Sequence, residues 1–205
     1  MRISLLTFHV FLIFLHAASA QSNLPVSDNG HDNNLLYSSV LAFGGLSTTT
    51  TGGGIKFCSS NALAKNPRFS IGPSVFAERL ILQKYSEEKN VKEVHTTLLS
   101  PGLNTKYQMN RSCYLQLDLT LLIGIETRLR NTPRPSGRME DDPRALSGLQ
   151  LEQTFFYRAL RGKQLQWGIG IFERVTDSNI YQADFGAKIY LGLGWVVRNN
   201  NRIDS

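Results

Sequence analysis

The segment DFGAKIYLGLGWVV, residues 184–197, alternates its side chains almost without interruption. Successive side chains of a β-strand point to opposite faces of a sheet, so this segment predicts one long strand. The odd-numbered positions form an apolar face, and the even-numbered positions carry mainly glycine with Asp184, Lys188 and Tyr190. The alternation alone does not show whether the apolar face meets a protein core or lipid.

The first twenty residues predict a secretory signal rather than a membrane helix. Arg2 precedes a mostly apolar run over residues 3–15, which is too short to cross a bilayer as a helix, and an Ala-Ser-Ala sequence ends the segment. We therefore expect residues 1–20 to be a signal peptide and residues 21–34 to form a mobile polar lead. The chain is therefore expected to be exported.

The composition restricts the remaining possibilities. Loss of Arg2 with the signal lowers the formal net charge from +6 to 6 − 1 = +5, and no block of Lys and Arg follows, so we expect no nucleic-acid partner. Beyond the signal no apolar run is long enough for a membrane helix, so any membrane crossing must use strands. The two cysteines show no metal-binding spacing, and we expect no metal and no cofactor.

Eight strands are predicted, and no segment with a helical period competes with them. They cover residues 35–47, 67–76, 79–85, 95–109, 113–128, 148–160, 163–175 and 181–197. Three tight turns, the first at Ala77-Glu78, alternate with four longer loops, which include residues 48–66 and 129–147. Short turns on one side and longer loops on the other are typical of outer-membrane barrels.

The polar rows of these strands, formed by even-numbered positions, are rich in glycine. Glycine weakens a solvated strand face but makes room inside a narrow barrel. The glycines are Gly102, Gly124, Gly168, Gly170, Gly186, Gly192 and Gly194. Their position favours a barrel with polar rows inside and apolar rows against lipid. A soluble barrel with the apolar rows inside would produce the same alternation and remains the alternative.

Aromatic residues of the apolar rows gather near the tight-turn end of the predicted strands. They are Tyr37, Tyr107, Tyr157, Trp167 and Trp195. Amphipathic rings concentrate where a membrane meets water, so we interpret these five as an aromatic girdle.

Charged residues occupy the polar rows, and we expect them to form a paired network that fills the lumen, because an unpaired buried charge is costly. The predicted network comprises Lys106, Asp118, Glu126, Glu152, Arg158, Asp184 and Lys188. We predict no catalytic residue. His95 beside Thr96 and Thr97 is the only histidine of the predicted strands, and we interpret it as a solvent-edge side chain.

These features resemble the small outer-membrane β-barrel proteins of Gram-negative bacteria, the porin-family or outer-membrane-protein β-barrel domains. The resemblance is carried by the Ala-Ser-Ala signal end, the eight amphipathic strands and the last strand AKIYLGLGWVV, and it covers residues 35–197. It implies an all-β, eight-stranded, antiparallel up-and-down transmembrane barrel, followed by a tail over residues 198–205. Many such proteins end in an aromatic residue, and this chain does not.

The expected function is that of a monomeric, non-enzymatic outer-membrane barrel with a side-chain-filled lumen. It would serve an envelope-structural or surface-interaction role, contacting lipid with its wall and an extracellular partner through loops 48–66 and 129–147. The alternative is a secreted, soluble, lipocalin-like barrel that binds an apolar ligand.

Two further expectations concern single residues. Pro73 and Pro101 fall inside predicted strands, where proline removes a ladder donor, so we expect bulges or shifted strand boundaries there. Cys58 lies in the first predicted long loop and Cys113 beside a tight turn, so we expect them at opposite barrel ends and not joined by a disulfide.

Overall fold

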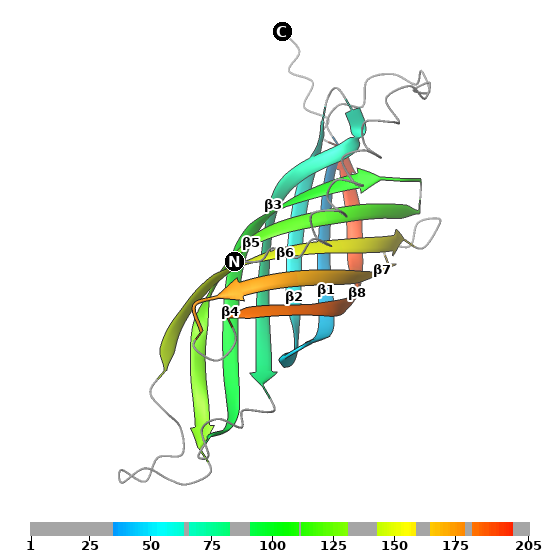
Figure 1. Ribbon diagram of the computed structural model, residues 1–205. Helices are drawn as coiled ribbons and strands as arrows, with labels where there is room; N and C mark the ends of the chain where they lie inside the picture. The colour runs from blue at the N-terminus through cyan, green and yellow to red at the C-terminus, as the bar shows by residue number, and fades with distance from the viewer. Residues whose placement is uncertain are drawn as a thin grey trace. The chain divides into compact units, whose positions relative to one another are not determined.

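Figure 1 shows the computed structural model, in which eight antiparallel strands form a closed barrel. The structure describes residues 35–63, 66–82, 91–110, 112–130, 143–158, 165–178 and 182–198. The strands are β1 (Leu35–Ser47), β2 (Thr50–Leu63), β3 (Asn66–Leu82), β4 (Val91–Gln108), β5 (Cys113–Arg130), β6 (Arg144–Arg158), β7 (Leu165–Thr176) and β8 (Ala183–Arg198).

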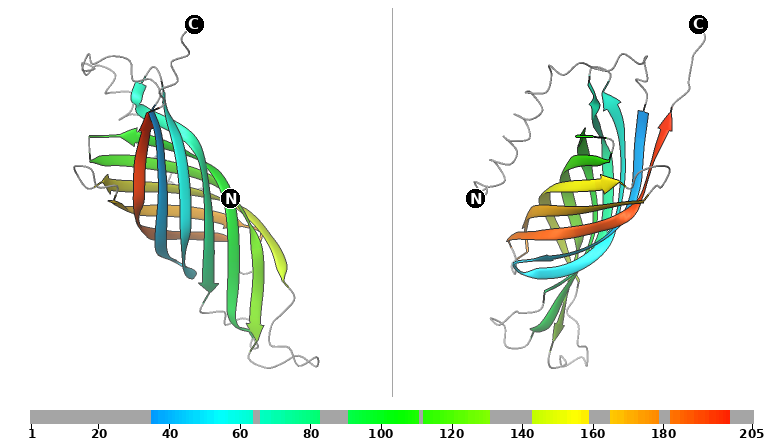
Figure 2. Two further views of the ribbon diagram at one scale, coloured as in Figure 1. Left: turned by 180° about the vertical axis from the view of Figure 1, so that it is seen from behind. Right: turned by 90° about the vertical axis from the view of Figure 1, so that its right-hand side faces the viewer.

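Each strand pairs with its neighbours in the sequence, and β1 pairs with β8 to close the barrel, as Figure 2 shows from two sides. This up-and-down topology confirms the predicted fold class. Within the described ranges, no helix is both long and apolar enough to cross a membrane. The predicted signal peptide, the polar lead and tail residues 199–205 lie outside the described residues, whereas Arg198 belongs to β8.

The barrel has two ends that differ in their connections. The β1–β2, β3–β4, β5–β6 and β7–β8 connections lie at one end, which we call the loop end. The other three connections, the start of β1 and the end of β8 lie at the opposite end, which we call the terminal end. The connections after β3 and β5 are the longest in the chain, so the long loops lie at the loop end, as predicted.

The second and third strands differ from the prediction. Residues 48–66, predicted to be a long loop, consist mostly of β2, and the predicted turn at Ala77-Glu78 lies inside β3. The prediction missed β2 and divided β3 into two strands. These two errors cancel, so the total of eight strands and the directions of β4 to β8 are as predicted. The glycine run over residues 52–54 caused the error, because glycine is depleted in strands. Here close packing requires it, since a Cβ on Gly54 would lie 1.9 Å from the carbonyl oxygen of Ala77.

The apolar rows face outward along the whole barrel. Leu99, Leu119 and Ile189 are 62%, 55% and 65% exposed, whereas Ser100, Thr120 and Tyr190, which follow them in the chain, are 0%, 1% and 1% exposed. A continuous belt of large exposed apolar side chains therefore covers the outer wall. Such a surface greatly exceeds the apolar patches that monomeric soluble proteins expose.

The prolines do not shift the register, contrary to our expectation. Pro73 pairs with Leu103 and Pro101 with Val75 in an uninterrupted β3–β4 register, and the shifts occur instead near Leu63 and Val91. Pro73 has no N–H to offer the facing strand β2. The side-chain amide of Asn104 donates to the carbonyl oxygens of Ser59 and Pro73 at 3.2 and 2.8 Å, so these carbonyl groups have a donor without a bulge.

The lumen contains an apolar cluster as well as charges. Its members are Leu41, Phe43, Phe76, Leu80, Leu98, Tyr114, Leu122, Leu146, Phe156 and Tyr190. The ring of Phe156 lies 4.9 Å from the ring of Tyr114 and is close to Gly168, where an added Cβ would meet it at 2.5 Å. Gly168 of β7 is the direct cross-strand partner of Phe156 of β6, so a small residue beside the ring makes room for it, as expected for a narrow barrel.

Candidate functional site: the charged lumen

A chain of alternating charges extends through the middle of the lumen. Lys56 Nζ contacts Asp118 Oδ2 at 2.7 Å and Glu152 Oε1 at 2.8 Å. Lys188 Nζ continues the chain, at 3.5 Å from Glu152 Oε2 and 3.2 Å from Glu78 Oε1. Each of these side chains is at most 2% exposed. Charges so deeply buried need close partners, and here each cation bridges two carboxylates.

Arg174 extends this chain toward the loop end. Its guanidinium lies 3.8 Å from Glu78 and 3.7 Å from Asp184, and its three nitrogens make no hydrogen bond despite their burial. The hydroxyl groups of Thr48 and Thr50 donate to the two carboxylate oxygens of Asp184 at 2.9 and 3.1 Å. The carboxylate is thereby attached to the β1–β2 turn.

Glu152 is the residue with the most partners in this network. The hydroxyl of Tyr190 donates to Glu152 Oε1 at 2.6 Å, Thr154 donates to the same oxygen at 3.1 Å, and Gln150 donates to Oε2 at 3.1 Å. Hydrogen bonds to an ionised acceptor are shorter and stronger than neutral ones. These contacts fix the carboxylate between the two lysines.

The predicted network residues fall into three places. Asp118, Glu152, Asp184 and Lys188 belong to the central chain of ion pairs. Glu126 lies toward the loop end, where it accepts from Ser178 Oγ at 2.7 Å and contacts Arg128 Nε at 3.4 Å. Lys106 and Arg158 lie apart from the chain, in a pocket at the terminal end.

Sequence reasoning missed Lys56, Glu78 and Arg174. Lys56 fell within the segment misassigned as a loop, and Glu78 within the predicted turn. A signal for Lys56 was present, because exposed Ile55 and Phe57 flank it in a short alternating run. Arg174 lies on the inner row of β7, two residues beyond Phe172, where continuing the alternation would have included it.

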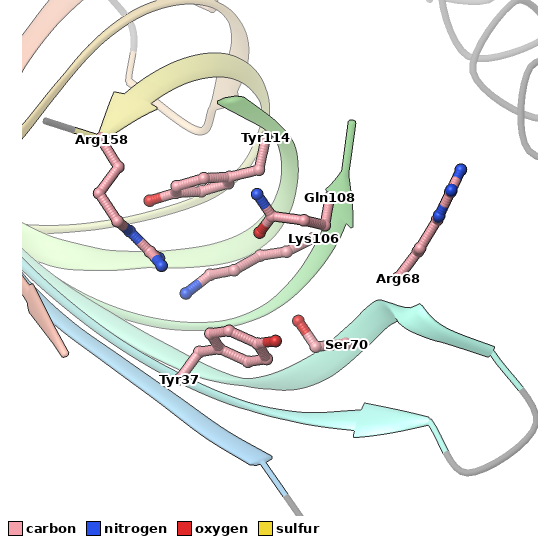
Figure 3. A pocket seen from close by; sticks show the side chains of 7 residues that line it. All are labelled: Tyr37, Arg68, Ser70, Lys106, Gln108, Tyr114 and Arg158. Atoms are coloured by element: carbon pink, nitrogen blue, oxygen red, sulfur yellow. The ribbon is translucent and has the colours of Figure 1, made fainter. Parts of the chain in front are cut away.

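The terminal-end pocket contains cations and tyrosines. Its lining residues are Tyr37, Arg68, Ser70, Lys106, Gln108, Tyr114 and Arg158, and Figure 3 shows them around the cavity. The cavity itself is small, with a volume of about 10 Å³. None of the described residues of the lining is a carboxylate, in contrast to the central network.

The predicted aromatic girdle needs one correction. Tyr37 points into the lumen and lines the terminal-end pocket, because the buried row of β1 includes Ser39 and Leu41. The alternation of β1 is weak, since serine occurs on both faces, and the facing could not be read from it. The other four aromatic residues lie on outward-facing rows near the terminal end, where the Tyr157 and Trp167 rings are 5.9 Å apart. Tyr107 is nevertheless only 6% exposed, with its ring 4.8 Å from that of Phe69.

His95 lies on the outer wall near the loop end and is not part of the lumen. Its Nε2 lies 3.0 Å from Glu93 Oε2, and its Nδ1 lies 3.2 Å from Arg79 Nη2. No serine or cysteine contacts this ring in the described ranges. The three side chains form a row of polar contacts, Arg79 to His95 to Glu93, at the edge of the apolar belt.

The described ranges contain no group of His, Cys, Asp and Glu side chains suited to a metal ion. Both cysteines are free. Cys58 is buried in β2, where its Sγ lies 3.5 Å from Gln116 Nε2. Our reason for expecting no disulfide was that Cys58 lies in a loop at the opposite end of the barrel from Cys113, and that reason was wrong.

The sequence matches no protein-family model and no curated protein. Solved outer-membrane proteins share the architecture. The structure is similar to Ail, the attachment invasion locus protein of Yersinia pestis, crystallised with the heparin analogue sucrose octasulfate (TM-score 0.48, 9% identity, 79% of this chain and 97% of that chain). It is likewise similar to the N-terminal β-barrel domain of Pseudomonas aeruginosa OprF (0.48, 10%, 80% and 98%) and to Neisserial surface protein A (0.41, 8%, 81% and 97%).

The fold is that of a small, eight-stranded outer-membrane β-barrel. Its outer wall is apolar, its lumen is charged, and its strands close without an edge. These are the properties that allow strands to cross a bilayer, because a closed sheet has no edge strand whose backbone groups would be left unpaired.

Proposed function

We propose that this protein is a monomeric barrel of the outer membrane, exported by residues 1–20, with an envelope-structural or surface-interaction role and no enzymatic activity. The observation that carries the proposal is the contrast between the two faces of the wall. Leu119 is 55% exposed on the outside, and its neighbour Asp118 is fully buried inside in contact with Lys56. Lipid suits the first face, and an ion-paired core suits the second.

This contrast also argues against the lipocalin-like alternative. A barrel that binds an apolar ligand needs its apolar rows inside, whereas here the inner rows carry Lys56, Asp118, Glu152 and Lys188. The same side chains argue against a general diffusion pore, because an eight-stranded lumen is only wide enough for side chains to fill it. The apolar part of the lumen, around Phe156 and Tyr190, reinforces that closure.

The loop end is the surface on which we expect recognition. Outer-membrane barrels have short turns toward the periplasm and long loops outside the cell, so the terminal end would face the periplasm. Of the two loops predicted to contact a partner, residues 48–66 are not a long loop, because most of them form β2 (Thr50–Leu63). The proposed contact surface is therefore the segment 129–147, whose residues 131–142 lie outside the described ranges.

Protease treatment of intact Gram-negative cells that express the protein tests this assignment. Trypsin should cleave after Arg138, in segment 129–147, and an Arg138→Gln variant should resist cleavage at that site. Lys163, in the β6–β7 connection of the terminal end, is the matched control and should be cleaved only after the outer membrane is permeabilised. Cleavage after Lys163 in intact cells, with Arg138 protected, would reverse the proposed orientation.

A further inference from the structure

The terminal-end pocket differs from the rest of the lumen in its charge balance. Three cations, Lys56, Lys188 and Arg174, meet four carboxylates in the central network. The lining of the pocket contributes Lys106 and Arg158 to the same small space, and none of its described residues is a carboxylate. Among the described residues, carboxylates thus balance the cations in the middle of the lumen and not at the terminal end.

Lys106 is the clearest sign that something is missing. Its side chain comes from β4, only 7% of the residue is exposed, and no described carboxylate lies within ion-pairing distance of it. Its ammonium lies 5.8 Å from the centre of the Tyr114 ring, a contact that offsets only a small part of the cost of burying a charge. Most buried lysines have a carboxylate partner in contact, and in the described part of the chain this one has an aromatic face instead.

Arg158 contacts the same ring and, among the described residues, also has no carboxylate partner. Its guanidinium carbon lies 5.6 Å from the Tyr114 ring centre, and its buried Nε has no hydrogen-bond partner in the described ranges. Figure 3 shows Arg158 from β6, Lys106 from β4 and Tyr37 from β1 directed toward one space, with Arg68 to the side. Two like charges that converge in this way repel each other unless an anion lies between them.

We propose that this pocket is a binding site for an oxyanion group, a phosphate or a carboxylate, that enters from the terminal end. Lys106 supplies a compact positive charge and Arg158 a planar fork with a free N–H, the pair of donors that suits phosphate and carboxylate oxygens. The Tyr37 hydroxyl lines the same cavity. About 10 Å³ is room for a single water-sized group, so one oxygen of the anion enters while the rest stays in the mouth.

The site requires the folded barrel but not the proposed contacts of the loops. Failure of this proposal is therefore distinguishable from failure of the proposed function. The protease experiment can succeed while anion binding is absent, and anion binding can be present while the protease experiment fails. The anion could be free in solution or attached to a lipid headgroup. Binding of inorganic phosphate in uncharged detergent would show a site for the free anion, and binding seen only with anionic lipid would assign it to a headgroup.

The test is a titration of the intact, refolded protein with inorganic phosphate in micelles of a non-ionic maltoside detergent, at constant ionic strength set with sodium chloride. The readout is NMR of arginine Nε–H groups in protein labelled with ¹⁵N-arginine, because the Arg158 signal, assigned by its loss in Arg158→Gln, reports on the proposed partner. We expect a saturable shift of this signal. Lys106→Gln should weaken binding at least tenfold.

Arg144→Gln is the matched control, since Arg144 is an exposed cation near the loop end, and it should leave the affinity unchanged. If Arg158→Gln does not fold, Arg158→Lys keeps the charge and assigns the Arg158 signal by the same loss. If neither phosphate nor anionic lipid produces a saturable shift, or if Lys106→Gln and Arg144→Gln bind phosphate equally well, the pocket is not an anion site.

Discussion

Replacement of Lys56 by methionine should destabilise the barrel more than any other single change in its lumen. Lys56 is 1% exposed and is the only ion-pair partner of Asp118 in the described ranges, at 2.7 Å. Among the described residues, the substitution leaves Asp118 without a cationic partner and leaves Glu152 with one, Lys188, at 3.5 Å. Removing one partner of a buried ion pair costs about 3 to 5 kcal/mol, and we expect a loss of unfolding free energy in this range.

The double variant Lys56→Met with Asp118→Asn separates this explanation from a simple packing defect. If the cost arises from the orphaned carboxylate, its neutralisation should recover part of the loss, and the two changes should be non-additive by about 1 to 3 kcal/mol. The double variant should therefore be more stable than Lys56→Met alone. A packing defect would make it less stable.

The measurement is reversible urea unfolding in lipid vesicles, followed by the electrophoretic shift between folded and unfolded barrel. Arg144→Met is the control, because Arg144 is exposed and an exposed charge should contribute about 0 to 1 kcal/mol. A Lys56→Met protein within about 1 kcal/mol of the wild type would refute the claim that the lumen depends on these ion pairs.

Two other predictions concern the outer wall and the loop end. Leu119→Arg should cost about 2 to 4 kcal/mol in vesicles if Leu119 lies near the bilayer midplane, and Ile125→Arg, further toward the loop end, should cost about 1 kcal/mol or less; equal costs in the same urea assay would contradict a lipid-facing row. Asp177, after β7, accepts the Ser147 backbone N–H at 2.8 Å, which holds its pKa below its ordinary value of 3.8. Its small stabilising contribution is present above that value and is lost as the pH falls through the lower folded pKa, so Asp177→Asn should remove this part of the pH dependence of unfolding.

Alternation predicted the fold well wherever the strands contain branched or aromatic residues. In β4, β5, β7 and β8 the outward rows were identified residue by residue, and Leu122, the one interruption noted in β5, lies in the apolar cluster of the lumen. The inner face of a narrow barrel tolerates leucine as readily as glutamine because water is excluded from both. Polarity alone therefore does not define the lumen.

The errors arose where local composition opposed the fold. The Thr-Gly segment of β2 has weak strand propensity, and only its close approach to β3 explains why it is extended. The residues of that hairpin include Lys56 and Glu78, so the missed strand also removed two members of the ion-pair chain. The register between strands that are distant in the sequence decides which charged side chains form ion pairs. Lys56 and Asp118, for example, are 62 positions apart, and a single sequence does not show that they are in contact.

The outward face of the wall is the central claim, and the fluorescence of two tryptophans tests it most directly. Trp167 and Trp195 are the only tryptophans of the chain, both lie near the terminal end, and they are 43% and 37% exposed. Amphipathic rings at a membrane boundary place their apolar part against acyl chains and their N–H near the headgroups. In vesicles with brominated lipids, bromine near the headgroup end of the chain should quench this fluorescence more strongly than bromine near the bilayer centre. Absence of quenching from every depth, with the barrel folded and vesicle-bound, would contradict a lipid-facing wall.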